Sequence, residues 1–392
     1  WYRIMELAKQ AWRWIACACA AEALRTSHTS RHGASAQESV GLADSRRLSF
    51  DSEEHYDDKL PVHATTPHAT VDRAKTDPNA FLYMSHRSLR WGVLYNPLLF
   101  SVEEALQTEG AVVARFNKTG DNAMLAGVRR AVATGKKPLV FFIAIDYAPV
   151  SAFKILQSCR RAGAYLVLYQ AEPGNAMHTI RAFETIGAHE VWEYSQRNIV
   201  GYDAAFRKKV PVRLIPPGFS RRLDVGVNLS SPERQLRSVG FMGQLDLRPA
   251  GIPALVRSTL EGQLAETFGV WTDAALRSFL ERYPLQISLH KYQTCCPHDE
   301  HERSAMEAFR LASLLSNNAC VISTPAAEED QQLWDGLVHY AELNETGEAL
   351  ARLFDSNEKV LDCQLQAGRL YRERFNVHRM MTASGFFDAW HP

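Results

Sequence analysis

Glu307 and Arg310 lie three residues apart in a segment whose apolar spacing predicts a helix, so both side chains project from one side of it. A carboxylate can accept hydrogen bonds from both hydroxyls of a ribose, and a guanidinium has planar donors that match a diphosphate. The same spacing also produces ordinary ion pairs on helix surfaces, and spacing alone leaves both interpretations open. The pair is a candidate contact for the ribose and phosphates of a nucleotide.

The elements around this pair form a strand, a loop, a helix and a second strand. Apolar patterns predict the strands at 285–289 and 319–323, and the loop between them contains Cys295-Cys296 followed by His298. Adjacent cysteines lack the two-residue spacing of a zinc-ligand pair, so no metal site is expected there.

Composition excludes several classes of protein. Basic and acidic residues both number 44 in 392 residues, so no overall field favours nucleic acid or an anionic membrane.

No P-loop, no GxGxxG turn after a strand and no GxSxG elbow is present in the sequence. The absence of these motifs disfavours P-loop NTPases, nicotinamide or flavin dehydrogenases and serine hydrolases.

The seven cysteines, an odd number, follow no regular framework. Cys159 and Cys320 sit in apolar patterns, so we expect reduced, partly buried thiols. Residues 25–80 lack hydrophobic periodicity, and we expect residues 1–80 to form a flexible, disordered leader or a targeting segment. We expect a cytoplasmic protein without a strong membrane signal, and secretory or organellar targeting stays open.

From about residue 81 the chain alternates between strand-like and helix-like segments. This pattern predicts parallel sheets covered on both faces, an α/β fold with two Rossmann-like domains in tandem. We place the first domain at 81–225, the second at 236–376 and a C-terminal helix at 377–392, with the hinge after Pro216-Pro217-Gly218. Ligands of such sheets bind at the carboxyl ends of the strands, so the cleft between the domains is the predicted site. The expected elements are strands at 91–95, 111–116, 139–145, 165–169, 190–193, 238–242, 267–270 and 337–340, and helices at 101–109, 121–134, 150–162, 175–187, 196–207, 250–264, 273–282, 345–355, 357–374 and 377–389.

Several blocks in this order resemble the GT-B glycosyltransferases, in particular the glycosyltransferase family 1-like group that includes spore-maturation-type proteins. The resemblance spans about residues 90 to 375. It is carried by VLYQAEP, HEVWEYSQRNI, RLIPPGF, SVGFMGQLDLR and ISLHKYQ, and by MEAFRLASLLSNNACVIS, which contains the Glu-x-x-Arg helix. It implies a GT-B type fold and a nucleotide-sugar that lies in the cleft and is held mainly by the C-terminal domain.

Within that resemblance, further residues gain a role on the donor side. Gly243 follows the first strand of the second domain, where a glycine lets main-chain N–H groups approach a diphosphate, and Arg248 adds charge to the same phosphates. His290 and Tyr292 end a later strand and face the cleft mouth, although a hydrogen-bonded core histidine is the competing interpretation of His290. Glu307 then contacts the ribose and Arg310 the phosphates.

The first domain should supply the acceptor side. Asp146 and Glu172 fall at strand ends, and either one is placed to deprotonate an acceptor hydroxyl if the reaction inverts the anomeric centre. A retaining reaction needs no dedicated base, and the sequence leaves both open. The Glu-x7-Glu signature of many retaining relatives is absent, because Ala305 and Ser313 occupy those positions.

The predicted function is therefore transfer of a sugar from a nucleotide-sugar donor to a glycan or other hydroxyl acceptor, a hexosyltransferase-like activity. We expect no cofactor and no metal, because arginines and helix N-termini can stabilise a leaving diphosphate. A sugar-nucleotide epimerase of the same architecture and a catalytically inactive binding protein remain as alternatives.

Overall fold

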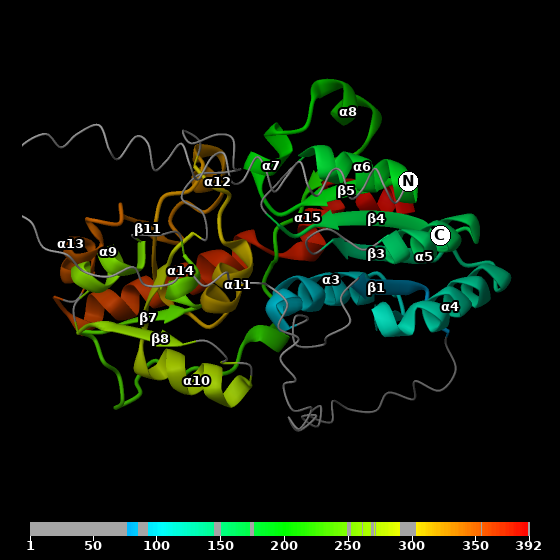
Figure 1. Ribbon diagram of the computed structural model, residues 1–392. Coiled ribbons are helices and arrows are strands. Elements are labelled where there is room, and N and C mark those ends of the chain that lie inside the picture. Colours follow the sequence, from blue (N-terminus) through cyan, green and yellow to red (C-terminus); the bar gives the residue numbers. More distant parts are fainter. Residues whose placement is uncertain are drawn as a thin grey trace, which may run out of the picture. The chain divides into compact units, whose positions relative to one another are not determined.

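The computed structural model describes residues 77–84, 93–144, 150–172, 176–248, 252–260, 262–267, 270, 272–290, 303–353 and 355–390 (Figure 1). The expected leader lies almost wholly outside these ranges. The described ranges also leave out Asp146, Tyr292 and the Cys295-Cys296 loop.

Six parallel strands form the first sheet of the described chain, in the order β2-β1-β3-β4-β5-β6. The strands are β1 (Ala80–Met84), β2 (Val113–Asn117), β3 (Leu139–Ala144), β4 (Tyr165–Gln170), β5 (Glu190–Glu193) and β6 (Val212–Leu214). The connecting helices are α3 (Asn96–Thr108), α4 (Asp121–Ala133), α5 (Val150–Arg161), α6 (Ala176–Ile186), α7 (Gln196–Val200) and α8 (Ala204–Lys209), with 3-10 turns η2 (Val93–Tyr95) and η3 (Lys118–Gly120).

The first sheet is apolar on both faces because helices cover both of them. Along β3, Phe141 packs in the cluster with α3 and the C-terminal helices, whereas its neighbours Val140 and Phe142 pack in the cluster with α4, α5 and α6. Successive side chains of a strand point to opposite faces, so a strand buried on both sides needs an unbroken apolar run. The run LVFFIA in β3 meets this requirement.

A second parallel sheet follows in the described part of the chain, in the order β11-β10-β9-β7-β8 (Figure 1). Its strands are β7 (Val239–Met242), β8 (Leu264–Thr267), β9 (Leu285–Ser288), β10 (Cys320–Ser323) and β11 (His339–Tyr340). Its helices are α9 (Ile252–Thr259), α10 (Asp273–Arg282), α11 (Ala308–Ser316), α12 (Glu328–Leu333), α13 (Thr346–Leu353) and α14 (Asn357–Arg374), with 3-10 turns η4 (Arg221–Leu223) and η5 (Leu245–Leu247). The predicted pair of Rossmann-like units is thus confirmed, while the domain boundaries stay predictions.

The chain ends on two further helices, α15 (Val377–Ala383) and α16 (Phe386–Trp390), which return to the first sheet. The Trp390 indole N–H donates to the Lys137 carbonyl at 3.2 Å, and the ring of Phe386 meets that of Trp192 edge to face at 4.8 Å. The sequence predicted one helix over 377–389. Gly385 divides it, because its φ of +70° is incompatible with a continuing right-handed helix.

Two strand predictions are wrong in position. A strand was expected at 91–95, but residues 93–95 form η2 and lead into α3, and the first strand is Ala80–Met84 instead. Pro97 sits in the first turn of α3, where its fixed φ favours a helix start. The strand expected at 267–270 is β8, which runs from Leu264 to Thr267. Its pairing with β7 begins at Leu264, so the strand lies three residues earlier than predicted.

The cysteine prediction is also corrected. Cys320, expected as a reduced thiol, forms a disulfide with Cys363, whereas Cys159 is free and buried. The two bonded residues are 43 positions apart in the sequence, and their pairing depends on α14 packing against β10, which local pattern does not reveal. No described helix is long and apolar enough to cross a bilayer.

Candidate functional site

Two arginines converge on the ring of Phe241, which is fully buried on β7. The guanidinium carbon of Arg310 lies 5.3 Å from the ring centroid and that of Arg248 lies 5.5 Å from it. Contact with the ring face is favourable for each cation. Burial lowers the pKa of Arg248 to about 10, and the neighbouring positive charge of Arg310 adds to this effect. The site therefore concentrates positive charge in a partly buried place.

Glu307 is the carboxylate beside this pair of cations. Its Oε2 lies 3.4 Å from Nη2 of Arg310, so the ion pair that was one of the two interpretations of the spacing is present. Arg310 also donates through Nη1 to the carbonyl of Leu289, which directly follows β9. The side chain of Arg310 is only 13% exposed and that of Glu307 only 25% exposed. This partial burial and the second arginine distinguish the pair from an ordinary surface ion pair.

Among the residues that the structure places here, Arg248 and Arg310 carry two positive charges and Glu307 carries one negative charge. The Nε atom of Arg248 is buried and has no hydrogen-bond partner among the residues that the structure describes. A buried donor without an acceptor is costly. An anion that reached Arg248 would satisfy this donor and balance the charge.

Gly243 has a different local role from the expected one. Its N–H donates to the Thr267 carbonyl at 2.9 Å and extends the pairing of β7 with β8, so this amide is not available to a diphosphate. A Cβ at Gly243 would lie 2.8 Å from Cζ of Phe241. Glycine therefore leaves room for the ring on which both arginines lie.

His290 follows β9 and is 1% exposed. Its Nε2 lies 2.9 Å from the Thr324 carbonyl, which can only accept, so Nε2 carries the proton. Burial lowers the pKa of His290, and the nearby negative charge of Glu307 opposes that shift. The imidazole is therefore neutral at neutral pH. His290 is buried and hydrogen-bonded through Nε2, as the competing interpretation requires, and its contact with a nucleotide-sugar stays a prediction.

The first unit contributes an acid and two tyrosines close to α11. The Tyr95 hydroxyl donates to Oε1 of Glu172 at 2.6 Å. The rings of Tyr95 and Tyr194 contact that of Phe309 on α11, with centroids 5.1 and 5.6 Å away. Phe309 lies between Glu307 and Arg310 in the sequence. The start of α11 therefore carries the donor-side pair and also contacts the tyrosines of the first unit.

Tyr194 lies among four carboxyl groups. Burial raises its pKa far above the usual value, and the negative charges of Glu193, Glu172, Asp330 and Glu307 raise it further. Glu172 and Glu307 were assigned from the sequence to acceptor and donor sides, and both act on this one hydroxyl. The negative charges of both predicted sides therefore raise the pKa of the same hydroxyl.

Asp330, on α12, was not predicted, and its carboxylate accepts several hydrogen bonds in this region. Its carboxylate accepts from the Ser195 hydroxyl at 2.7 Å and from the Gln196 N–H at 2.8 Å, at the start of α7 in the first unit. It also accepts from the Met306 N–H at 2.9 Å, just before Glu307. A signal was present, because an acidic run, 328–330, follows β10, but its partners at the start of α7 are more than a hundred residues away in the sequence.

Glu193 is a second acid that the sequence analysis missed. It ends β5 and is fully buried, where the Tyr202 hydroxyl donates to it and the Asn198 amide donates at 2.9 Å. Burial raises the pKa of Glu193 to about 8, and these two hydrogen bonds oppose the shift. A large share of this carboxyl group therefore holds its proton at neutral pH.

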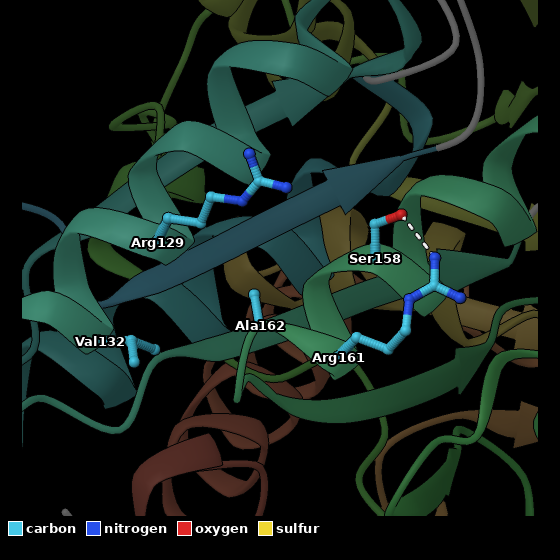
Figure 2. Close-up of a pocket in the computed structure, with 5 residues that line it drawn as sticks. All are labelled: Arg129, Val132, Ser158, Arg161 and Ala162. Atoms are coloured by element: carbon cyan, nitrogen blue, oxygen red, sulfur yellow. Dashed lines mark hydrogen bonds between the residues drawn. The ribbon is translucent and has the colours of Figure 1, made fainter.

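A pocket lies between helices of the first unit (Figure 2). Its volume is about 360 Å³, and it is lined by Arg129, Val132, Ser158, Arg161 and Ala162. These residues lie near the C-terminal ends of α4 and α5. Helices that connect parallel strands run back toward the strands' amino ends, so this pocket faces away from the carboxyl-end site.

Comparisons with known proteins give structural likeness only. No protein-family model matches the sequence, and no curated protein matches it. HepE of Anabaena, solved with UDP-glucose, is 14% identical over 79% of this chain and 99% of its own, with a TM-score of 0.47. The lipopolysaccharide outer core galactosyltransferase WaaB is 11% identical over 79% and 99%, with a TM-score of 0.41. TarM of S. aureus, solved with UDP and other ligands, is 9% identical over 68% and 59%, with a TM-score of 0.45. Because these TM-scores lie below 0.5, none of the likenesses assigns an activity to this chain.

Replacing Asp330 should destabilise the protein more than removal of a helix cap within one unit. Asp330→Ala leaves the N–H groups of Gln196 and Met306 and the Ser195 hydroxyl without their acceptor, and we expect a loss of about 2–4 kcal/mol. The matched control is Asp203→Ala, which removes the exposed cap of α8 and should cost about 1 kcal/mol. Urea denaturation measures both, and equal losses would contradict the role given to Asp330.

The buried carboxyl of Glu193 should give the protein a characteristic pH dependence. Its pKa is raised from 4.5 to about 8 on folding, so the native state binds more protons than the unfolded state between these values. The free energy of unfolding of the wild type, relative to Glu193→Gln, should therefore fall as the pH rises through this window. Denaturation at several pH values measures this difference. Glu184→Gln, at an exposed position, is the control, and a difference that stays constant with pH would refute the raised pKa.

Proposed function

We propose that this protein is a glycosyltransferase that moves a sugar from a nucleotide-sugar donor to a hydroxyl group of a glycan or another acceptor. The observation that supports the proposal is the convergence of Arg248 and Arg310 on Phe241, with Glu307 beside them, at the carboxyl ends of the second sheet. Two guanidiniums with one carboxylate suit a dianionic group attached to a diol, and the diphosphate and ribose of a nucleotide have this combination.

The arginines have a catalytic as well as a binding function in this proposal. When the bond from the sugar to the diphosphate breaks, negative charge grows on the leaving phosphate oxygen. Fixed cations in a partly buried site stabilise that charge without having to reorganise. Phe241 orients both guanidiniums, and the Arg310 bond to the Leu289 carbonyl fixes one of them before the donor binds.

Glu172 is the proposed base of the first unit. It is hydrogen-bonded to Tyr95 and lies close enough to Tyr194 to influence its pKa, as Glu307 does from the other unit. In an inverting reaction it removes the proton of the acceptor hydroxyl as the sugar transfers. Asp146, outside the described residues, is the alternative base, and a retaining reaction uses neither. Glu307 accepts from the ribose hydroxyls and Arg310 contacts the phosphates.

The arginine pair also underlies the proposal that transfer is independent of a divalent metal. Two guanidiniums can neutralise the charge that Mg²⁺ or Mn²⁺ neutralises on the leaving diphosphate of a metal-dependent enzyme.

Nucleotide binding tests the site directly. Calorimetry with UDP, GDP and ADP should show binding of at least one of them to the wild type, and Arg248→Gln and Arg310→Gln should each weaken it about 10- to 100-fold, the value of a charge-assisted hydrogen bond. Arg369→Gln is the control, because this exposed arginine pairs with Glu373 on α14 and should leave binding unchanged.

The outcome separates the proposal from its alternatives. Unaltered affinity in both arginine variants would place the nucleotide elsewhere. A nucleotide-sugar converted by the wild type without an acceptor, seen by NMR of the products, would indicate an epimerase. Binding without transfer, hydrolysis or conversion in single-turnover assays would indicate an inactive binding protein.

Chelation tests metal independence. With a donor and acceptor that support transfer, excess EDTA should leave the initial rate unchanged within experimental error, because the arginines neutralise the leaving group. The control is Arg310→Gln, whose rate should fall with and without EDTA. Loss of wild-type activity in EDTA and its recovery with Mn²⁺ would refute metal independence.

A further inference from the structure

A cluster of soft ligand atoms lies on the second sheet, apart from the arginine site. Cys320 begins β10, His339 begins β11 and Cys363 lies on α14. One ligand atom from each residue lies within 4.8 Å of the other two, and Sγ of Cys363 is 3.4 Å from Nε2 of His339. The two sulfur atoms form the disulfide described above.

The fold brings these three residues together on one face. Ile322 of β10 pairs with His339 of β11, and Cys320 lies two positions before Ile322, so it points to the same face of the sheet. Helix α14 packs against β10 and carries Cys363 to that face. The arrangement follows from the topology and does not depend on a flexible loop.

The chemistry of the ligand set is specific. Two thiolates and one imidazole suit Zn²⁺, whereas Mg²⁺ and Ca²⁺ require oxygen ligands. In a tetrahedral zinc site with sulfur and nitrogen ligands, neighbouring ligand atoms are about 3.5–3.8 Å apart, as follows from bond lengths of about 2.0–2.3 Å. The distance of 3.4 Å from Cys363 Sγ to His339 Nε2 is already close to this range. Reduction of the disulfide would let the two sulfur atoms move apart to the distance that zinc requires.

The three residues of the cluster differ in their exposure to solvent. Cys320 is fully buried, Cys363 is half-buried and His339 is exposed. An ion can therefore reach the cluster from the side of His339, while the buried sulfur excludes water from the far side. With three protein ligands, a water molecule would occupy the fourth position.

We propose that the reduced form of this cluster binds one Zn²⁺ through Cys320 Sγ, His339 Nε2 and Cys363 Sγ, and that the disulfide is its oxidised, metal-free form. A dithiol reductant supplies two electrons, the bond between the sulfur atoms breaks, two thiols form and the dithiol becomes a disulfide. Zinc then replaces the two thiol protons, which pass to solvent, and takes the lone pair of His339 Nε2.

This site is independent of the proposed transfer reaction. Cys320 begins β10, whereas Thr324, the hydrogen-bond partner of His290, directly follows the carboxyl end of that strand. The ion would tie β10, β11 and α14 together in the reduced protein, as the disulfide does in the oxidised one. Its effect is therefore expected on stability, and its failure would leave the nucleotide site untouched.

Cobalt(II) serves as the spectroscopic probe for the test. The full chain carries serine in place of the other cysteines that could compete for metal, Cys17, Cys19, Cys295 and Cys296. After reduction with a phosphine, titration with Co²⁺ should give a thiolate-to-cobalt charge-transfer band that saturates at one ion per chain, and Zn²⁺ should abolish it. About two protons per ion should be released. The same chain with its disulfide intact is the matched control and should give no such band.

Variants identify the ligands. His339→Ala should weaken binding by about 10-fold or more, since even partners beyond the ligands contribute about 10- to 100-fold. Cys363→Ser should lose most of the band, and Cys159→Ser should leave it unchanged. His339 is exposed, so its variant keeps the test decisive if Cys363→Ser does not fold. A reduced protein without the band, equal binding by the oxidised protein, or unaltered binding in His339→Ala would overturn the proposal.

Discussion

The carboxylate of Asp330 holds together the segments that carry the candidate site. It accepts from the N–H of Gln196, two residues after Tyr194, and from the N–H of Met306, the residue before Glu307. A buried carboxylate is costly unless donors surround it, so its several donors fix its position and it fixes theirs. Helix α11 consequently starts at a defined place, with Phe309 among tyrosines of the first unit and Arg310 against Phe241. Asp330 and the ring contacts of Phe309 together fix the relation between the two predicted sides of the site.

The two guanidiniums of the candidate site lie close enough to each other for their positive charges to repel. Arg248 and Arg310 repel each other in a partly buried place, and among the described residues Glu307 offsets their charge. In the proposal made above, a bound anion relieves this repulsion. The ring of Phe241, which Gly243 leaves room for, sets the geometry of both cations. Binding and stabilisation of a leaving diphosphate would then draw on the same two side chains.

The sequence predicted those features that depend on local pattern. The unbroken apolar runs of β3 and β4 identify strands buried on both faces, and Glu307 and Arg310 are recognisable from helical spacing. Features set by distant partners were missed. Asp330 depends on backbone groups of α7, Glu193 on the burial of β5, and the Cys320–Cys363 disulfide on the packing of α14. The first strand, Ala80–Met84, was missed because its five residues follow directly on a segment without periodicity.

A crystal structure of the protein with a bound nucleoside diphosphate tests the central claim most directly. The account predicts the diphosphate within hydrogen-bond distance of the guanidiniums of Arg248 and Arg310, and the ribose hydroxyls at Glu307. A nucleotide bound in the pocket between α4 and α5, or anywhere that leaves Arg248 and Arg310 without contact to phosphate, would contradict it.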